Sequence, residues 1–241
     1  MNPLTVFYTI FTYIAIAIFI LGFLTKIWKY GATPSPLKIP TTPAPTTAFG
    51  AGIRVACEAL FFRSLFKGNK FIWLGGAVLH ASLLVILISH TRYFIHPVPE
   101  CLMYFQVFFQ NIGHYAGYIL LLAIGYLGLR RIFIDQTAYI SILADYFILA
   151  LIFCIGASGV LLKYITRPDL VSVKAFTLGL ISFKPEAVPT NPIFLIHLTL
   201  ILILLIYFPF SKLMHAGGIF FSPTRHQVDN SREKRHVNPW D

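Results

Sequence analysis

Charged residues are scarce in this sequence. Only 12% of its 241 residues are Asp, Glu, Lys or Arg, while 57% are hydrophobic. Soluble domains carry about 25% charged residues. The deficit, together with apolar runs of about 20 residues, excludes an ordinary soluble domain and predicts an integral membrane protein. The net charge of +10 does not indicate nucleic-acid binding, because the basic residues lie between apolar segments, where they act as topology signals.

Cysteine is scarce as well. Cys57, Cys101 and Cys154 form no CxxC motif and lie in separate segments, which excludes disulfide, zinc and iron–sulfur frameworks within the chain. Any iron–sulfur chemistry must therefore belong to a partner. No Lys or Arg precedes the first apolar run, and no small-residue cleavage site follows it, so we expect a membrane span there rather than a cleavable signal peptide.

Five apolar segments reach the length that a bilayer core requires. Fourteen of the Lys and Arg residues fall on one side of these segments and five on the other. The positive-inside rule then places the N-terminus outside and the C-terminus in the cytoplasm. We therefore predict an all-α bundle of five transmembrane helices in the cytoplasmic membrane, with spans at about 4–25, 71–93, 113–129, 138–162 and 193–216.

The domain organisation follows from these spans. We expect one membrane domain over residues 1–220 and a cytoplasmic tail over 221–241. A cytoplasmic linker, rich in Pro and Thr, and an amphipathic helix interrupt the domain at about residues 30–70. In this helix Arg54 and Glu58 lie four residues apart beside a Phe- and Leu-rich face, which is typical of an interfacial helix. Both the lipid surface and a protein partner remain open as what that face contacts.

Four of the eight histidines lie inside the second and fifth predicted spans, where an unpaired polar ring is costly. His80 and His90 are ten residues apart on span 2, and His197 and His215 are eighteen apart on span 5. Because the predicted topology makes these spans antiparallel, His80 and His215 lie nearer the cytoplasm and His90 and His197 nearer the outside. Two cross-helix pairs at two depths are what two six-coordinate haems b require.

The two histidine spacings do not match on ideal helices. Ten residues rise about 15 Å and eighteen about 27 Å. Eighteen residues make five full turns, so His197 and His215 would share one face, whereas His80 and His90 would lie about 80° apart around the helix. Pro209 removes a backbone hydrogen bond, and we expect it to kink span 5 just before His215 and so absorb the mismatch.

Other polar residues near the span ends have two interpretations each. His96 and His114, near the outer surface, are either ordinary interfacial histidines or members of a quinol site that accept a proton during quinol oxidation. Arg92 and Lys212 either pair with haem propionates or act as topology and snorkelling charges.

Span 4 carries a carboxylate and a run of small residues. Asp145 is best interpreted as a helix-start residue facing Arg130 or Arg131, although intramembrane carboxylates also mark functional sites. The GASG stretch, Gly156–Gly159, gives this span a thin face, which would admit a haem or a quinol or would only allow close helix packing.

The five spans, the histidine spacings of ten and eighteen, and the run FPFSKLMH (Phe208 to His215) together resemble the gamma subunit of respiratory nitrate reductase and its relatives. The resemblance implies an inner haem on His80 and His215 and an outer haem on His90 and His197. It also implies oxidation of a quinol such as menaquinol near the outer haem, or quinone reduction if the flow is reversed, with electrons crossing to a cytoplasmic iron–sulfur subunit.

The proline-rich linker and the final HVNPWD are more similar to the M subunit of the Dsr membrane complex of sulfur-metabolising microbes. That branch implies a cytoplasmic iron–sulfur partner resembling heterodisulfide reductase, with multihaem cytochrome c and further membrane subunits, and a role linked to sulfite reduction. The alternatives are a nitrate reductase gamma subunit, a haem-containing anchor without quinol chemistry, and a haem-free transporter whose histidines relay protons. A transporter would be expected to have broken helices or an internal repeat, and neither is evident in the sequence.

Overall fold

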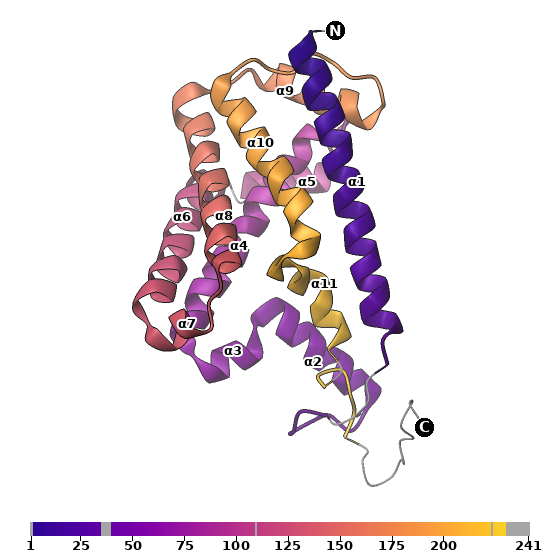
Figure 1. Ribbon diagram of the computed structural model, residues 1–241, viewed down its shortest axis with the longest axis vertical. Helices are drawn as coiled ribbons and strands as arrows, with labels where there is room; N and C mark the ends of the chain where they lie inside the picture. Colours follow the sequence, from indigo (N-terminus) through magenta and orange to yellow (C-terminus); the bar gives the residue numbers. More distant parts are fainter. Residues whose placement is uncertain (1, 35–39, 109, 223, 230–241) are drawn as a thin grey trace. The chain divides into compact units, whose positions relative to one another are not determined.

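The computed structural model describes residues 2–34, 40–108, 110–222 and 224–229. The predicted linker residues 35–39 and tail residues 230–241 lie outside this part of the chain. The described ranges are helical and contain no strand. The helices are α1 (Pro3–Ala32), α2 (Ala48–Phe61), α3 (Arg63–Gly68), α4 (Lys70–His90), α5 (Glu100–Phe108), α6 (Gln110–Phe133), α7 (Asp135–Tyr139), α8 (Leu143–Leu161), α9 (Leu170–Ile181), α10 (Pro192–Tyr207) and α11 (His215–Gly218), with a π-helical turn at Leu162–Thr166 and 3₁₀ turns at Thr91–Tyr93, Phe208–Phe210, Lys212–Met214 and Ile219–Phe221 (Figure 1).

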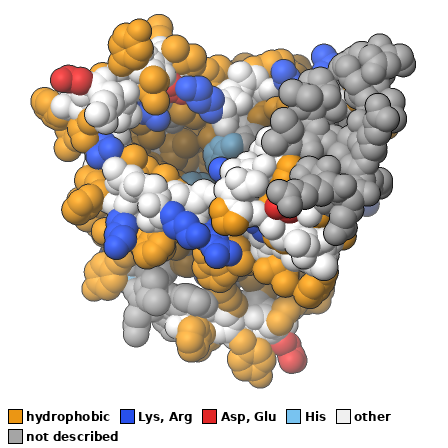
Figure 2. Space-filling view, turned by 90° about the horizontal axis from the view of Figure 1, so that it is seen from below, with side chains coloured by type: hydrophobic (Ala, Val, Ile, Leu, Met, Phe, Trp, Pro, Cys, Tyr) orange, Lys and Arg blue, Asp and Glu red, His pale blue; other side chains and the backbone are white. Residues whose placement is uncertain are grey.

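Five of the helical segments are long and apolar enough to cross a membrane, which confirms the predicted number of spans. Large hydrophobic side chains are exposed along all five, as expected of surfaces that meet lipid rather than water. Figure 2 shows hydrophobic side chains exposed on one face, with Lys and Arg side chains gathered between them. The segments are Pro3–Ala32, Lys70–Tyr93, Gly113–Phe133, Leu143–Thr166 and Pro192–Phe210.

The fifth span is shorter than predicted. The α-helix ends at Tyr207, and two 3₁₀ turns follow before α11 begins at His215. Pro209 has no backbone N–H to donate the hydrogen bond that would continue the helix. The helix therefore ends where we expected only a kink. The prediction of one helix through residue 216 is therefore wrong, and the argument that His197 and His215 share one helical face falls with it. Span 4 likewise begins at Leu143, after the separate turn α7.

The chain divides into two compact units. The first contains the residues up to Ile18 together with Leu74–Tyr207, and the second contains Phe19–Trp73 and the residues from Phe208 on. In the first unit α6 packs along α8, and α8 packs along α10 (Figure 1). Gly117 makes the first of these contacts possible, because a Cβ there would lie 2.9 Å from the Val160 side chain.

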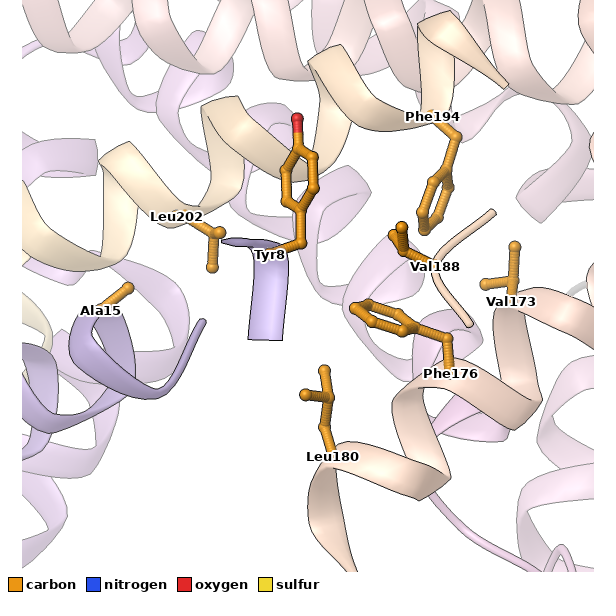
Figure 3. Close-up of a cluster of buried hydrophobic side chains, with 8 residues drawn as sticks. All are labelled: Tyr8, Ala15, Val173, Phe176, Leu180, Val188, Phe194 and Leu202. Carbon is orange, nitrogen blue, oxygen red and sulfur yellow. The ribbon is translucent and has the colours of Figure 1, made fainter. Parts of the chain in front are cut away.

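The core of the first unit joins the start of α1 to α9, α10 and the loop between them (Figure 3). Phe176 of α9 is fully buried at the centre of this cluster. Asp169 begins α9, since its carboxylate accepts hydrogen bonds from the backbone N–H groups of Val171 and Ser172. The remaining members of the cluster are Tyr8, Ala15, Val173, Leu180, Val188, Phe194 and Leu202.

Hydroxyl groups on α1 add directional contacts to this apolar core. The Tyr8 hydroxyl lies 2.9 Å from the Thr199 hydroxyl on α10. The Thr5 hydroxyl accepts a hydrogen bond from the backbone N–H of Val188, and the Tyr13 hydroxyl donates to the carbonyl of Leu180. Because lipid offers no competing hydrogen bonds, these contacts fix how α1 lies against α9 and α10.

Asp145 lies in the first turn of α8, as its helix-start interpretation requires. Its carboxylate accepts a hydrogen bond from the backbone N–H of Ile142 and forms an ion pair with Arg131, with 3.4 Å between Nη1 and Oδ2. Only 4% of the Asp145 side chain is exposed. The predicted structural role, with Arg131 as the partner, is confirmed.

In the second unit, the turns after Pro209 pack against the second half of α1. Gly22 approaches Pro209 closely, because an added Cβ would lie 2.7 Å from the proline ring. The Phe208 ring meets the ring of Phe19 edge-on at 5.2 Å. Gly217 lies against the Phe23 and Ile27 side chains, again with no room for a Cβ. These contacts position the segment that carries His215.

Glu58 of α2 is the buried polar centre of the second unit. Its carboxylate accepts hydrogen bonds from the backbone N–H and the hydroxyl of Ser64, and it forms an ion pair with Arg225 at 3.0 Å. Burial raises the pKa of Glu58, but the Ser64 hydrogen bonds and the charges of Arg225 and Arg54 outweigh it and hold the pKa below its usual value. The chain after α11 is thus tied to α2.

Replacing Phe176 with Ala should destabilise the first unit by about 3–5 kcal/mol, because removing a fully buried ring leaves a cavity in the core. The thermal unfolding midpoint in detergent measures the effect. Val171→Ala, on the exposed side of the same helix, is the control and should change the midpoint little. Equal shifts for both variants would contradict the placement of the core.

Glu58→Gln should release the segment around Arg225 by removing the charge that pairs with it. We expect tryptic cleavage after Arg225 to become several-fold faster in the detergent-solubilised protein. Glu186→Gln, which alters an exposed carboxylate, is the control and should leave the rate unchanged. Acid should act in the same direction: because the pKa of Glu58 is lowered by folding, its stabilising contribution is present at neutral pH and is lost as the pH falls through that lowered pKa.

Candidate haem-binding histidines

Three of the four predicted ligand histidines make the same local contact. Nδ1 of His80 lies 2.7 Å from the carbonyl oxygen of Gly76, and Nδ1 of His90 lies 2.7 Å from that of Ile86. Nδ1 of His215 lies 2.7 Å from the carbonyl oxygen of Lys212. A carbonyl oxygen can only accept, so Nδ1 must be the protonated nitrogen in each neutral ring. The lone pair then resides on Nε2, which is the nitrogen that a haem iron would bind.

His197 reaches the same tautomer through a side chain. Its Nδ1 lies 2.9 Å from the Ser158 hydroxyl on α8. That hydroxyl is within donating distance of the carbonyls of Cys154 and Ile155, at 2.8 and 3.0 Å. With its single hydrogen on the Cys154 carbonyl, the Ser158 oxygen is free to accept from Nδ1–H of His197. This tautomer leaves the lone pair on Nε2 in His197, as in the other three histidines.

The small residues of α8 are explained by this contact. A Cβ on Gly159 would lie 3.3 Å from Cε1 of His197, so a larger residue would push the imidazole away from α8. Ser158 supplies the hydrogen-bond acceptor one residue earlier. The GASG stretch thus positions the His197 ring, which neither interpretation of the sequence anticipated. Small residues in a span suggest only close packing, and the partner of Ser158 becomes visible only in three dimensions.

His90 and His197 both belong to the first unit. The His90 ring also meets the Tyr93 ring edge-on at 5.9 Å. Thr177 of α9 donates a hydrogen bond to the Tyr93 carbonyl, which ties this end of α4 to the core. His80 belongs to the first unit and His215 to the second.

The donor set fits haem better than a bare metal ion. Among the described residues, no three His, Cys, Asp or Glu side chains gather as a bound ion would require. A haem iron needs only two protein ligands, because the porphyrin supplies four. Two neutral imidazoles that each present Nε2, on helices with apolar surroundings, meet that need.

The predicted quinol-site histidines lie on different elements. His96 is exposed in the loop before α5, whereas His114 lies on α6. The carbonyl of His114 accepts hydrogen bonds from the Lys163 ammonium and the Tyr164 hydroxyl, and its ring lies 6.3 Å from that of Tyr164. Lys163 also donates to the Gly113 carbonyl at 3.0 Å. Lys163 and Tyr164 both belong to the π-helical turn Leu162–Thr166, which sets the direction of their side chains. The sequence gives no signal for this turn.

The two cations predicted near propionates are both exposed. The Arg92 guanidinium stacks over the Tyr93 ring at 5.7 Å, beside His90. Lys212 is the first residue of the 3₁₀ turn that leads into His215, and its carbonyl lies 2.7 Å from Nδ1 of that ring. Each cation thus lies within three residues of a predicted ligand histidine, and its role toward propionates stays a prediction.

Comparison with known proteins places the chain in a family. Residues 62–231 match the nitrate reductase gamma subunit family. The chain is also similar to the Hdr-like menaquinol oxidoreductase cytochrome b-like subunit of Archaeoglobus fulgidus, at 37% identity over 98% of this chain and 83% of the relative. The corresponding subunit of Archaeoglobus profundus is 35% identical over 100% of this chain and 84% of the relative.

If His197 binds a haem iron, as the sequence predicts, replacing Ser158 with Ala should raise the reduction potential of that haem. The hydrogen bond from Nδ1–H makes an axial imidazole more electron-donating, so its loss favours the ferrous state. Potentiometric titration of the haem absorbance and the low-spin ferric EPR signal measure the change. Ser82→Ala removes a buried hydroxyl that bonds only within its own helix and should leave this potential unchanged. Unaltered potentials in Ser158→Ala would contradict the assigned contact.

Proposed function

Because this chain belongs to the nitrate reductase gamma subunit family, we propose that it is a dihaem cytochrome b subunit that oxidises menaquinol in a membrane oxidoreductase. The observation that carries this proposal is the common tautomer of the four histidines, each of which directs its proton to a local acceptor and its lone pair to Nε2. A proton-relay transporter would need rings that exchange protons on both nitrogens, and the fixed Nδ1 donors disfavour it.

The outer haem is assigned to His90 and His197. Both residues belong to the first unit, which supports the pairing, and Gly159 and Ser158 hold the His197 ring in place. The inner haem is assigned to His80 and His215. This second pairing rests on the predicted depths of the two residues and on the family pattern carried by FPFSKLMH. Bound haem supplies one-electron transfer, which lets a two-electron quinol deliver its electrons one at a time.

The quinol site is proposed at the outer ends of α4, α6 and α8. Quinol oxidation releases two protons, and His96 and His114 are the imidazoles placed to accept them. Lys163 and Tyr164 hold the backbone of His114 against the end of α8 and add two polar side chains to this region. Gly159, which contacts His197, precedes Lys163 by one turn on the same side of the helix, so the polar group lies next to the proposed outer ligand.

The chain is proposed to deliver electrons to a cytoplasmic iron–sulfur subunit resembling heterodisulfide reductase. The names of the two Archaeoglobus relatives support this, since both describe Hdr-like menaquinol oxidoreductases. The N-terminus lies outside and the C-terminus inside, as the distribution of basic residues predicts. The proline-rich linker and the HVNPWD terminus favour a Dsr-type, sulfite-reduction-linked complex over a nitrate reductase, with multihaem cytochrome c and further membrane subunits as additional partners.

Single replacement of a ligand histidine should remove one of two haems. Ala at His90 or His197 should abolish reduction by a menaquinol analogue, because the haem nearest the quinol is lost. Ala at His80 or His215 should leave one haem that the analogue still reduces, while electron delivery to the partner stops. The pyridine haemochrome assay counts the haems, and a reduced-minus-oxidised spectrum follows their reduction.

His226→Ala is the control for these variants, because it changes a histidine outside the proposed ligand set. It should retain two haems per chain. A count other than about two haems per wild-type chain would contradict the dihaem assignment. Retention of both haems in His80→Ala or His215→Ala would show that the inner pair is wrong.

A further inference from the structure

Helix α2 exposes its apolar face and buries a charged residue, the reverse of a helix on a water-facing surface. Phe49, Ile53 and Leu60 are exposed, at 80%, 48% and 70% of their surfaces, and they lie within about 40° of one another around the helix. The opposite side is buried and carries Ala51 and Glu58. An amphipathic helix in water turns its apolar side inward. The exposed side of α2 is therefore built to meet an apolar phase.

The inward polar side is stable because its charge is fully engaged. Glu58 accepts two hydrogen bonds from Ser64 and pairs with Arg225, so the second unit holds the polar face of α2 from within. The helix cannot rotate to bury Phe49 and Leu60 without exposing those groups and breaking the ion pair. Its orientation is thus fixed by the chain itself.

The chain also fixes the depth of α2, because its end is tied to the start of a membrane span. The indole N–H of Trp73, in the first turn of α4, donates to the Phe61 carbonyl at 2.8 Å. The Phe66 ring of α3 packs edge-on against the Trp73 ring at 4.9 Å. Asn69 begins α4 by accepting hydrogen bonds from the next backbone N–H groups. Tryptophan at the end of a span marks the boundary between lipid and water.

Three exposed cations accompany the apolar face at this boundary. Arg63, Lys67 and Lys70 lie on α3 and at the start of α4, and the Lys70 ammonium sits over the Phe66 ring at 5.7 Å. Exposed Lys and Arg beside an apolar helix face are the pattern that binds anionic headgroups, with about 1 kcal/mol for each cation near the surface. A protein partner would not require cations at the level of the span end.

We propose that α2 and α3 form an anionic-lipid anchor embedded in one leaflet, with Phe49, Ile53 and Leu60 among the acyl chains. Arg63, Lys67 and Lys70 bind the phosphates of anionic lipids at the same level. The occupant of this face is the lipid leaflet and not a protein subunit. The anchor does not depend on haem or quinol chemistry, so its test is separate from that of the proposed function.

The experiment places a spin label at Leu60→Cys in the full-length chain, with Cys57, Cys101 and Cys154 replaced by Ala. The protein is reconstituted into vesicles of equal parts phosphatidylglycerol and phosphatidylcholine. Collisions with oxygen, which concentrates in lipid, and with a water-soluble nickel chelate report the surroundings of the label. A label at Thr46→Cys, in the exposed segment before α2, is the aqueous reference.

We expect the ratio of oxygen to nickel collisions to be several-fold higher at residue 60 than at residue 46. A nickel accessibility at residue 60 equal to that at residue 46 would overturn the proposal. In that case the apolar face of α2 would be the contact surface of a protein partner. Adding that partner should then lower the nickel accessibility of the label. Circular dichroism of each labelled chain verifies that the helices are intact.

A second arm tests the headgroup contact. Replacing Arg63, Lys67 and Lys70 together with Gln should lower the ratio at residue 60 in the anionic vesicles to its value in pure phosphatidylcholine. Gln at Arg167, Lys174 and Lys184 removes the same charge from α9 and the residues on either side of it and should leave the ratio unchanged. An unaltered ratio in the first triple variant, or an equal loss in the second, would overturn the role of these three cations.

Discussion

In the hydrocarbon core of a bilayer, a polar group must find its hydrogen-bond partner within the protein. A histidine side chain has two ring nitrogens, so this constraint applies to it twice. In His80, His90 and His215 a backbone carbonyl of the chain accepts the hydrogen bond from Nδ1–H, and in His197 the Ser158 oxygen can accept it. When Nδ1 carries the hydrogen of a neutral ring, the lone pair lies on Nε2. The need to avoid an unpaired donor in lipid therefore also fixes the tautomer that the proposed haem ligation requires.

The same constraint explains why α8 matters although it carries no proposed ligand. Its first turn holds Asp145 against Arg131, which satisfies a carboxylate that would otherwise be buried alone. Farther along, Ser158 and Gly159 orient His197, and Lys163 and Tyr164 then bond the backbone of α6. α8 lies between α6 and α10 and contacts both. The position of α8 therefore determines the position of the His197 ring and of the proposed quinol region.

Features that depend on one segment were predictable from the sequence. Span number follows from the length of apolar runs. Asp145 was predicted to start its helix and to face Arg130 or Arg131, and the structure pairs it with Arg131. Features that depend on contacts between segments were not. The break of α2 occurs at Phe62, which adopts φ 51° although phenylalanine does not favour that region. The Ser158 contact and the π-helical turn after Leu161 likewise follow from neighbouring helices, so no local pattern announces them.

Pro209 shows how a correct local prediction can carry a wrong consequence. Proline was expected to disturb span 5, and it does, but α10 ends at Tyr207 instead of bending and continuing. His215 is therefore not placed by the rest of span 5. It is placed by the turns that pack on α1 through Gly22, Phe208 and Gly217. The two proposed ligands on this part of the chain thus depend on different neighbours: His197 on α8, and His215 on the second half of α1. Unequal sequence spacing is acceptable for such ligands, because no single helix has to carry both.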